Sequence, residues 1–342
     1  MKLERVAPPP PATLRRWLKR FGGLEVVVWG DFICDEYWFC RSSRLSREAP
    51  VPVLEYESRE YRAGGAGNAA LNLAALGARV AVVGWRGRDE AGERLADALR
   101  ARHIDTTGLA LRAGEDTVVK TRIVAGAEHT ARQQVVRVDR GARFAATGHG
   151  TRDAVAALER ATRGARAIVL SDYGYDSVVP RLANRLIPRW RARGLTVALD
   201  SRFRLAEFRG VTVATPNESE AAAAAGVAVR DEITLAAVAT RLRRRTRAEQ
   251  LVITRGRDGL TLWGARRALS LEAWGGAEAV DVTGAGDAVV AAATLALAAG
   301  APALAAAALA NVAGSVAVSR RGAVAVTGAE ITRALAVARV RA

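Results

Sequence analysis

The sequence of 342 residues has few cysteines, histidines and lysines. The spacing of its two cysteines, Cys34 and Cys40, matches no zinc-binding pattern, and its three histidines are scattered along the chain. No signal-peptide pattern precedes the cysteines. We therefore expect free thiols in a reducing compartment, no structural metal and a cytoplasmic location.

Because lysine is so scarce, the formal net charge of +16 comes from arginines, which are spread along the whole chain. Together with the many alanines, this distribution indicates a coding bias more than a basic patch. No nucleic-acid-reading motif and no interleaving of aromatic with basic residues accompanies the charge. We therefore expect no nucleic-acid partner, and the charge would serve to attract anionic substrates.

The chain also has no uninterrupted apolar run long enough to cross a membrane. The alanine-rich stretches 288–299 and 301–319 are broken by Gly300 and Pro302. The first stretch would form about 18 Å of helix, against a bilayer core of about 30 Å. We expect two buried helices and no membrane partner.

Apolar runs of strand length alternate with amphipathic helical stretches. Strands are expected near residues 24–29, 80–84, 167–171, 195–200, 211–214 and 251–254, and helices near 69–76, 153–162, 178–193 and 235–245. This rhythm predicts an α/β fold with a doubly wound, mostly parallel sheet and helices on both faces.

Two segments depart from this rhythm. Residues 37–61 and 118–139 form short pieces in which apolar and polar residues alternate, which is typical of half-exposed antiparallel strands. We expect them to form a small antiparallel β lid on a single domain of residues 23–342. Residues 1–22 would be an N-terminal extension outside the fold.

Residues 281–287 precede the first alanine-rich helix. Gly284, Ala285 and Gly286 allow a tight turn into that helix, whose free N–H groups and dipole form an anion site. Asp287 in the first turn could simply cap the helix. Its place beside an anion favours a catalytic role, in which it takes a hydroxyl proton during phosphoryl transfer.

A second glycine motif, Gly64-Gly65-Ala66-Gly67-Asn68, joins the lid to the next helix. It permits close backbone approach to a ligand and hinging of the lid, although a plain loop-to-helix turn is the alternative. Together the two motifs resemble the signatures of the PfkB (ribokinase-like) sugar kinases. The resemblance implies a ribokinase-like fold, catalysis by Asp287 and residues 284–286, ATP with Mg²⁺, and a homodimer paired through the lid.

Acids near the first strand are candidates for binding the sugar. Asp31 ends this strand and Asp35 follows it, at the edge of an open α/β sheet where ligands gather. Capping of a turn is the alternative for Asp31. The resemblance supports a sugar contact for Asp35, Gly64, Gly65 and Asn68.

The nucleotide side is expected farther along the chain. Asn217 and Glu220 are similar to the family's NxxE element, which holds Mg²⁺ largely through water, and they also fit a capping box. The remaining expectations concern the nucleotide and a monovalent cation. Thr254, Arg255, Gly256 and Gly259 would form a phosphate loop, although Arg255 could instead be solvated. Asn311 would approach adenine or else have a packing role. Asp281 and Thr283 would form a weakly specified K⁺ site.

Within the family, several segments are similar to D-glycero-β-D-manno-heptose 7-phosphate kinases. They are Gly30-Asp31 with Asp35, residues 43–53, Lys120 with Arg122, residues 133–139 and Ser171-Asp172-Tyr173. This similarity implies phosphorylation of the sugar 1-hydroxyl for ADP-heptose (lipopolysaccharide core) biosynthesis. It also implies substrate contacts by Arg44 and Asp172, and binding of the substrate's phosphate by Lys120, Arg122 and Arg202.

Two departures leave the sugar open. Tyr175 stands where the heptose kinases usually have lysine, and Asp200-Ser201-Arg202 replaces Asp-Pro-Lys. A PfkB kinase for another sugar, sugar phosphate or nucleoside is therefore an alternative, and a non-catalytic sugar- or nucleotide-binding regulator is another. No cytidylyltransferase-like segment follows, so we expect a stand-alone kinase.

Overall fold

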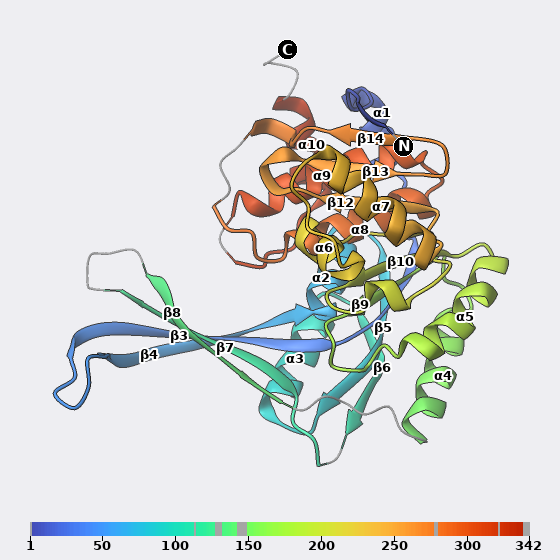
Figure 1. The fold of residues 1–342 in the computed structure, drawn as a ribbon. Helices are drawn as coiled ribbons and strands as arrows, with labels where there is room; N and C mark the ends of the chain where they lie inside the picture. The colour runs from blue at the N-terminus through green and yellow to red at the C-terminus, as the bar shows by residue number, and fades with distance from the viewer. Residues whose placement is uncertain are drawn as a thin grey trace.

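The computed structural model describes residues 2–112, 114–126, 132–141, 149–276, 280–320 and 322–337. It consists of an α/β body, from which a long β arm projects to one side (Figure 1). The body is organised around a ten-stranded sheet with the strand order β1-β14-β13-β12-β11-β10-β9-β2-β5-β6. Its strands are β1 (Leu3–Arg5), β2 (Glu25–Gly30), β5 (Arg79–Gly87), β6 (Asp105–Arg112), β9 (Ala167–Asp172), β10 (Thr196–Ser201), β11 (Val213–Ala214), β12 (Gln250–Thr254), β13 (Leu260–Trp263) and β14 (Ala268–Leu271).

The strands from β6 to β12 in this order run parallel, and β13 is antiparallel to both of its neighbours. Alternate residues of each central strand face opposite sides. In β2, Val26 and Val28 pack into one apolar core, whereas Val27 and Trp29 pack into the other. Burial on both faces explains why these strands are continuous apolar runs, and it confirms the doubly wound α/β fold expected from the sequence.

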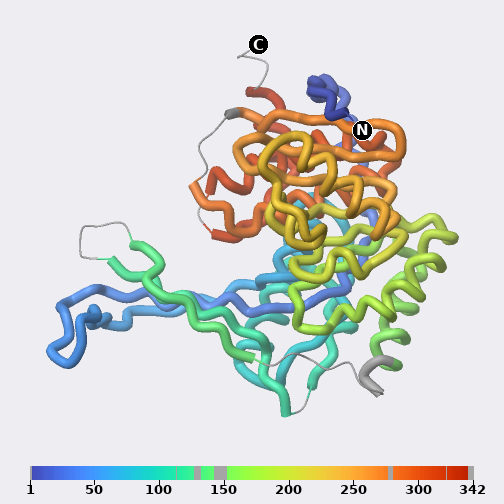
Figure 2. The backbone as a smooth tube through the Cα atoms, in the orientation of Figure 1, coloured from blue at the N-terminus to red at the C-terminus, as the bar shows by residue number. Residues whose placement is uncertain are grey.

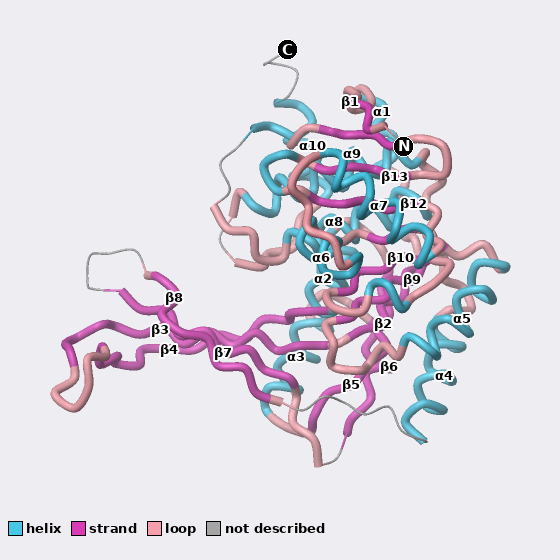
Figure 3. Tube along the Cα trace, viewed as in Figure 1, coloured by secondary structure: helices cyan, strands magenta, loops and turns pink. Residues whose placement is uncertain are grey.

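Helices cover both faces of the sheet (Figure 3). The first face is covered by α1 (Pro11–Leu18), α2 (Ala66–Ala75), α3 (Glu90–Arg100), α8 (Ala285–Ala298), α9 (Ala303–Val318) and α10 (Gly328–Val337). The second face is covered by α4 (His149–Ala161), α5 (Pro180–Ala192), α6 (Glu218–Ala225) and α7 (Glu232–Thr246). The two alanine-rich stretches form α8 and α9 as expected, and none of the helices in the described ranges is long and apolar enough to cross a bilayer.

The N-terminal segment is part of the body, which corrects the expectation of an extension. Strand β1 pairs in parallel with β14 at the edge of the sheet. Leu14, Leu18 and Phe21 are buried in the same core as α9 and α10. The blue N-terminal trace accordingly lies beside the orange and red C-terminal elements (Figure 2). The proline-rich composition of residues 8–11 gives no sign of this tertiary packing.

The lid is a four-stranded sheet with the order β4-β3-β7-β8. Its strands are β3 (Phe32–Leu45), β4 (Pro52–Gly65), β7 (Val118–Gly126) and β8 (Gln133–Arg140). The pairs β3–β4 and β7–β8 are antiparallel, but β3 and β7 run parallel. The prediction of a wholly antiparallel lid is therefore wrong, since the sheet is mixed. The two hairpins pair through β3 and β7, which run in the same direction.

Candidate active site

A cavity of about 1120 Å³ lies where the lid meets the carboxyl ends of the body's parallel strands. It collects most of the residues predicted from the sequence. Those lining it are Asp35, Gly64, Gly65, Asn68, Lys120, Arg122, Asp172, Arg202, Asn217, Glu220, Thr254, Gly256, Gly259, Thr283, Gly284, Ala285, Gly286, Asp287 and Asn311. The predicted residues Asp31, Arg44, Arg255 and Asp281 do not line it.

Asp287 lies in the first turn of α8 and is held at both carboxylate oxygens. Asn68 of α2 donates a hydrogen bond from its Nδ2 to Oδ2 at 2.6 Å, and the Tyr173 hydroxyl donates to Oδ1 at 3.2 Å. The contact with Asn68 joins the two glycine motifs across 219 residues of sequence. The motifs thus form a single site.

Burial raises the pKa of Asp287 to about 7. The negative charges of Asp35 and Glu220 contribute to this rise, whereas the hydrogen bonds from Asn68 and Tyr173 oppose it. A carboxylate whose pKa lies near neutrality is suited to accept a proton from an alcohol and to release it again. Asp287 therefore has the environment expected of a general base.

Gly284 enables the contact between the two motifs. It is the N-cap of α8, with a φ of 78° that favours glycine. A Cβ at this position would lie 2.6 Å from Nδ2 of Asn68 and 3.2 Å from Cα of Ala323. The absence of a side chain lets the start of α8 pack against Asn68, with the first turn of the helix at the cavity.

Asp35 on β3 forms a largely buried ion pair with Arg122 on β7, with 2.6 Å between Oδ1 and Nη1. Gly64 on β4 packs directly against this carboxylate, so that any side chain there would clash with it. The lid hairpins and the first glycine motif together fix one acid and one cation at the cavity wall. Both groups present hydrogen-bonding atoms suitable for a hydroxylated ligand.

Asp31 supports a loop instead of lining the cavity. Its two oxygens accept hydrogen bonds from the backbone N–H groups of Tyr173, Tyr175 and Ser177, at 2.8 to 3.0 Å. The carboxylate is 1% exposed, and burial raises its pKa. Turn capping, the alternative noted from the sequence, is the role that the structure gives this residue.

The lid end of the cavity is cationic. Lys120 on β7, Arg137 on β8 and Arg202 after β10 line it together with Arg122. In the part of the chain that the structure describes, neither Lys120 nor Arg202 has an ion-pair partner. Burial and the nearby Arg202 lower the pKa of Lys120. An anionic ligand would reduce the electrostatic repulsion between these cations and accept their hydrogen bonds.

Arg204 holds Asp172, at the end of β9, in place. Its guanidinium contacts both Asp172 and Asp176, and the Ser201 hydroxyl donates to Asp172 Oδ2 at 2.7 Å. The heptose-kinase pattern has a lysine at position 175, whereas here a cation reaches this loop from residue 204. The departure noted from the sequence therefore lies in a loop whose acids are bound by Arg204.

Asp200 and Glu220 form an acidic wall of the cavity, and the charge of the nearby Arg202 acts on both carboxylates. Burial raises the pKa of both, and the neighbouring acids raise that of Asp200 further. Asn217 and Glu220 form a capping box: Asn217 Oδ1 accepts from the Glu220 N–H at 2.8 Å, and Glu220 Oε2 accepts from the Asn217 N–H at 2.9 Å. Glu220 Oε1 takes no part in this capping box.

Facing carboxylates are suited to a hard cation. No group of three or more Asp, Glu, His or Cys among the described residues is arranged to hold a metal ion. Mg²⁺ commonly keeps several waters and binds one or two carboxylates together with substrate phosphates. Asp200 and Glu220 fit such an ion, which would bind mostly through water and nucleotide oxygens.

Of the remaining predicted nucleotide residues, all but Arg255 line the cavity. Thr254, Gly256 and Gly259 line the cavity, whereas the guanidinium of Arg255 turns away to Glu218, with an Nε–Oε2 distance of 2.9 Å. Asn311 of α9 lines the cavity through a side chain whose Nδ2 donates to the Glu272 carbonyl at 2.6 Å. This bond fits the packing alternative, and the approach of Asn311 to adenine remains a prediction.

Asp281 and Arg44 also lie outside the cavity. Asp281 accepts the N–H groups of Thr283 and Gly322 on its two oxygens, at 2.9 and 2.8 Å, and thus closes the loop before α8. Arg44 is exposed toward the far end of the lid. The cation site at Asp281 and Thr283 and the substrate contact of Arg44 remain predictions.

Several cavity residues were quoted in sequence motifs without being assigned a role. They are Tyr173, Asp200, Gln134 and Arg137. Asp200 ends an apolar strand just as Asp31 does, so the same strand-end rule could have found it. Tyr173 and Arg137 carry no comparable signal, because their position depends on how the lid and the β9 loop pack.

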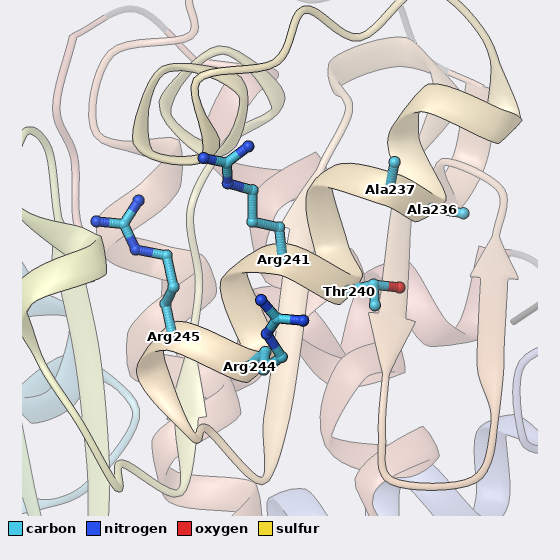
Figure 4. Close-up of a pocket in the computed structure, with 6 residues that line it drawn as sticks. All are labelled: Ala236, Ala237, Thr240, Arg241, Arg244 and Arg245. Atoms are coloured by element: carbon cyan, nitrogen blue, oxygen red, sulfur yellow. The ribbon is translucent and has the colours of Figure 1, made fainter.

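A second hollow, on the outer face of α7, lacks these features. Its lining consists of Ala236, Ala237, Thr240, Arg241, Arg244 and Arg245, which project from a single helix (Figure 4). No strand end, acid or second element contributes to its lining. Groups from several elements converge only in the larger of these two hollows, which we therefore take as the active site.

Curated relatives resemble this chain over most of its length. Bifunctional protein HldE of Geobacter sulfurreducens is 38% identical over 316 residues, which cover 92% of this chain and 63% of that protein. Bifunctional protein HldE of Pseudomonas aeruginosa PAO1 is 38% identical over 324 residues, which cover 93% and 65%. The chain thus spans somewhat less than two thirds of the length of these relatives.

Solved structures show the same fold at low sequence identity. Ribokinase of Arabidopsis thaliana, complexed with ribose and ATP, has a TM-score of 0.72 at 19% identity and covers 92% of this chain and 99% of its own. Phosphofructokinase-2 of Escherichia coli, in complex with potassium, has a TM-score of 0.73 at 18% identity with the same coverage. Residues 24–328 match the model of the pfkB family carbohydrate kinases. The chain belongs to this family and is a phosphotransferase that acts on a carbohydrate.

Proposed function

We propose that this kinase transfers the γ-phosphoryl group of ATP to the 1-hydroxyl of D-glycero-D-manno-heptose 7-phosphate, for ADP-heptose and lipopolysaccharide-core biosynthesis. One observation carries the proposal: a single cavity contains both the buried Asp287 and a cluster of cations, two of which, Lys120 and Arg202, form no ion pair within the described residues. An acceptor that already bears a phosphate would engage Lys120 and Arg202 while its free hydroxyl reaches Asp287. The motifs at residues 43–53 and 171–173 support a heptose as the sugar.

The chemistry follows from the start of α8. Asp287 takes the proton from the 1-hydroxyl as the sugar oxygen forms a bond to the γ-phosphorus and the bond from that phosphorus to the ADP oxygen breaks. The N–H groups at residues 284–287 stabilise the charge on the transferring group. Asp35 and Asn68 orient the sugar, and in-line positioning supplies much of the remaining rate enhancement.

The acidic wall would serve the nucleotide. Mg²⁺ beside Glu220 and Asp200 would neutralise charge on the ATP oxygens when bound. Thr254, Gly256 and Gly259 would border the phosphates. We place K⁺ near Thr283 as a further expectation, and we propose a cytoplasmic enzyme because both cysteines are free thiols.

The lid offers a surface for a second copy of the chain. Trp38, Ile123 and Val136 form a row across β3, β7 and β8, on the face opposite Tyr37, Arg122 and Arg137. Trp38 is 38% exposed and Val136 is 44% exposed, which is typical of an apolar patch that pairs with a partner. Light scattering should show a dimer that Val136→Asp dissociates, and a wild-type monomer would contradict this assembly.

An acceptor panel tests the proposed substrate. Release of ADP should be measured with heptose 7-phosphate, heptose, fructose 6-phosphate, ribose and a nucleoside at equal concentrations. We expect heptose 7-phosphate to give the highest kcat/KM. Turnover of ribose or fructose 6-phosphate without turnover of heptose 7-phosphate would refute the substrate, and the absence of turnover with every acceptor would favour a non-catalytic binding protein.

A further inference from the structure

We infer that Tyr173 is a positioning residue for catalysis: its hydroxyl orients the carboxylate of Asp287 so that a free acceptor site on that carboxylate faces the sugar hydroxyl. This inference rests on the proposed role of Asp287 as the base. It goes beyond that role by assigning a second residue that affects the rate through the base.

The hydrogen bonds at Asp287 define the orientation of its carboxylate. Asn68 of α2 donates to one oxygen at 2.6 Å, and Tyr173 of the loop after β9 donates to the other at 3.2 Å. A carboxylate has about four acceptor positions, so each oxygen keeps one for a ligand. Two donors fix the carboxylate plane, whereas one donor would leave it free to rotate.

Tyr173 itself is firmly placed. Its backbone N–H donates to Asp31 Oδ2 at 2.8 Å, and the same oxygen accepts the N–H of Tyr175 at 3.0 Å. The ammonium of Lys120 lies 5.5 Å from the centre of the Tyr173 ring and 5.7 Å from that of Tyr175, within the range of a cation–π contact. The buried Asp31 therefore anchors the loop that carries Tyr173.

The two tyrosines form a natural matched pair. They share the loop, the Asp31 anchor and the Lys120 contact, but only Tyr173 donates to Asp287 and lines the cavity. Removal of either hydroxyl leaves the aromatic ring in place. A loss of kcat confined to Tyr173→Phe, with KM unchanged, therefore points to the hydrogen bond to the base.

The other ionisable groups around the base stay unchanged in such variants. Asp35 on β3, Asp200 on β10 and Glu220 on α6 contribute negative charge, and burial has the largest effect on the pKa of Asp287. The Tyr173 hydrogen bond stabilises the ionised form. Its loss should therefore move the acid limb of the kcat/KM profile toward higher pH.

The test compares Tyr173→Phe with Tyr175→Phe in steady-state assays of the full chain. Tyr173→Phe should lower kcat about three- to tenfold, the range expected for one hydrogen bond, and shift the acid limb upward with the KM for the sugar phosphate within about twofold. Tyr175→Phe should match the wild type in both respects. A wild-type kcat and acid limb in Tyr173→Phe would overturn the inference, as would equal losses in both variants.

Asp287→Asn separates this inference from the proposed function. Wild-type turnover of Asp287→Asn would refute the base assignment on which the inference depends. Loss of turnover in Asp287→Asn with a neutral Tyr173→Phe would refute the inference alone. The thermal unfolding midpoint of each variant, measured with the same samples, distinguishes a loss of activity from a loss of folded protein.

Discussion

The two ends of the cavity differ in the groups that surround the ligand. At the α8 end, Asp287 is buried among neutral donors and other acids. At the lid end, neither Lys120 nor Arg202 forms an ion pair within the described part of the chain, although acids lie near both. Burial works against the charged form at both ends, since it raises the pKa of Asp287 and lowers that of Lys120.

This difference separates binding from catalysis. A base must release and regain a proton near neutral pH, and burial among acids provides that property. A phosphate-binding cation must keep its charge and have no internal partner to displace. Substitutions at the α8 end should therefore change kcat, whereas those at the lid end should change the KM for the sugar phosphate.

The largest effect is expected from Asp287→Asn. The amide keeps the shape of the side chain but cannot accept the proton, so kcat should fall about 10²- to 10⁴-fold. Binding of ATP, measured by calorimetry, should remain within a few-fold of the wild type. A wild-type kcat in Asp287→Asn would contradict the assignment of catalysis to the α8 end.

Gly284→Ala should have the next largest effect. The new Cβ would lie 2.6 Å from Nδ2 of Asn68 and would hold a φ of 78°, so the start of α8 must shift away from Asn68. Misplacement of the base by about 1 Å can cost about 10²-fold in kcat. Gly286→Ala is the matched control, because its Cβ meets nothing within 4 Å and should cost much less.

Arg202→Met should act on binding. Loss of one charged hydrogen-bond donor should raise the KM for the sugar phosphate about ten- to hundredfold, with kcat nearly unchanged. Arg202→Lys should recover part of the affinity through its remaining charge. A fall in kcat with an unchanged KM would contradict the role of Arg202 in binding the substrate's phosphate.

The smallest expected effect is the dependence of kcat/KM on pH. Because Asp287 acts in its ionised form and its pKa is raised to about 7, kcat/KM should rise with pH through about 7 and level off above it. Activity at pH 6 should thus be about a tenth of the plateau value. A profile that is flat from pH 5.5 to 8 would show that this carboxylate does not limit the rate.

Much of this architecture follows from local patterns in the sequence. The strand runs at β2, β9 and β10 and the glycine motifs at residues 64–68 and 284–287 depend on short-range chemistry, so their positions could be predicted. The roles of Asp31 and Arg255 depend on partners elsewhere in the chain. Asp31 accepts backbone N–H groups of a loop, and Arg255 pairs with Glu218. Such contacts arise only when the chain packs, and the same is true of the pairing of β1 with β14.

The role of the lid end is tested most directly by acceptor discrimination in the wild type and in Lys120→Met. The quantity is the ratio of kcat/KM for heptose 7-phosphate to that for unphosphorylated heptose. The account predicts a strong preference for the phosphorylated acceptor that Lys120→Met reduces about tenfold or more, while turnover of the unphosphorylated sugar is unchanged. An unchanged ratio in Lys120→Met would contradict the assignment of the lid end to the substrate's phosphate.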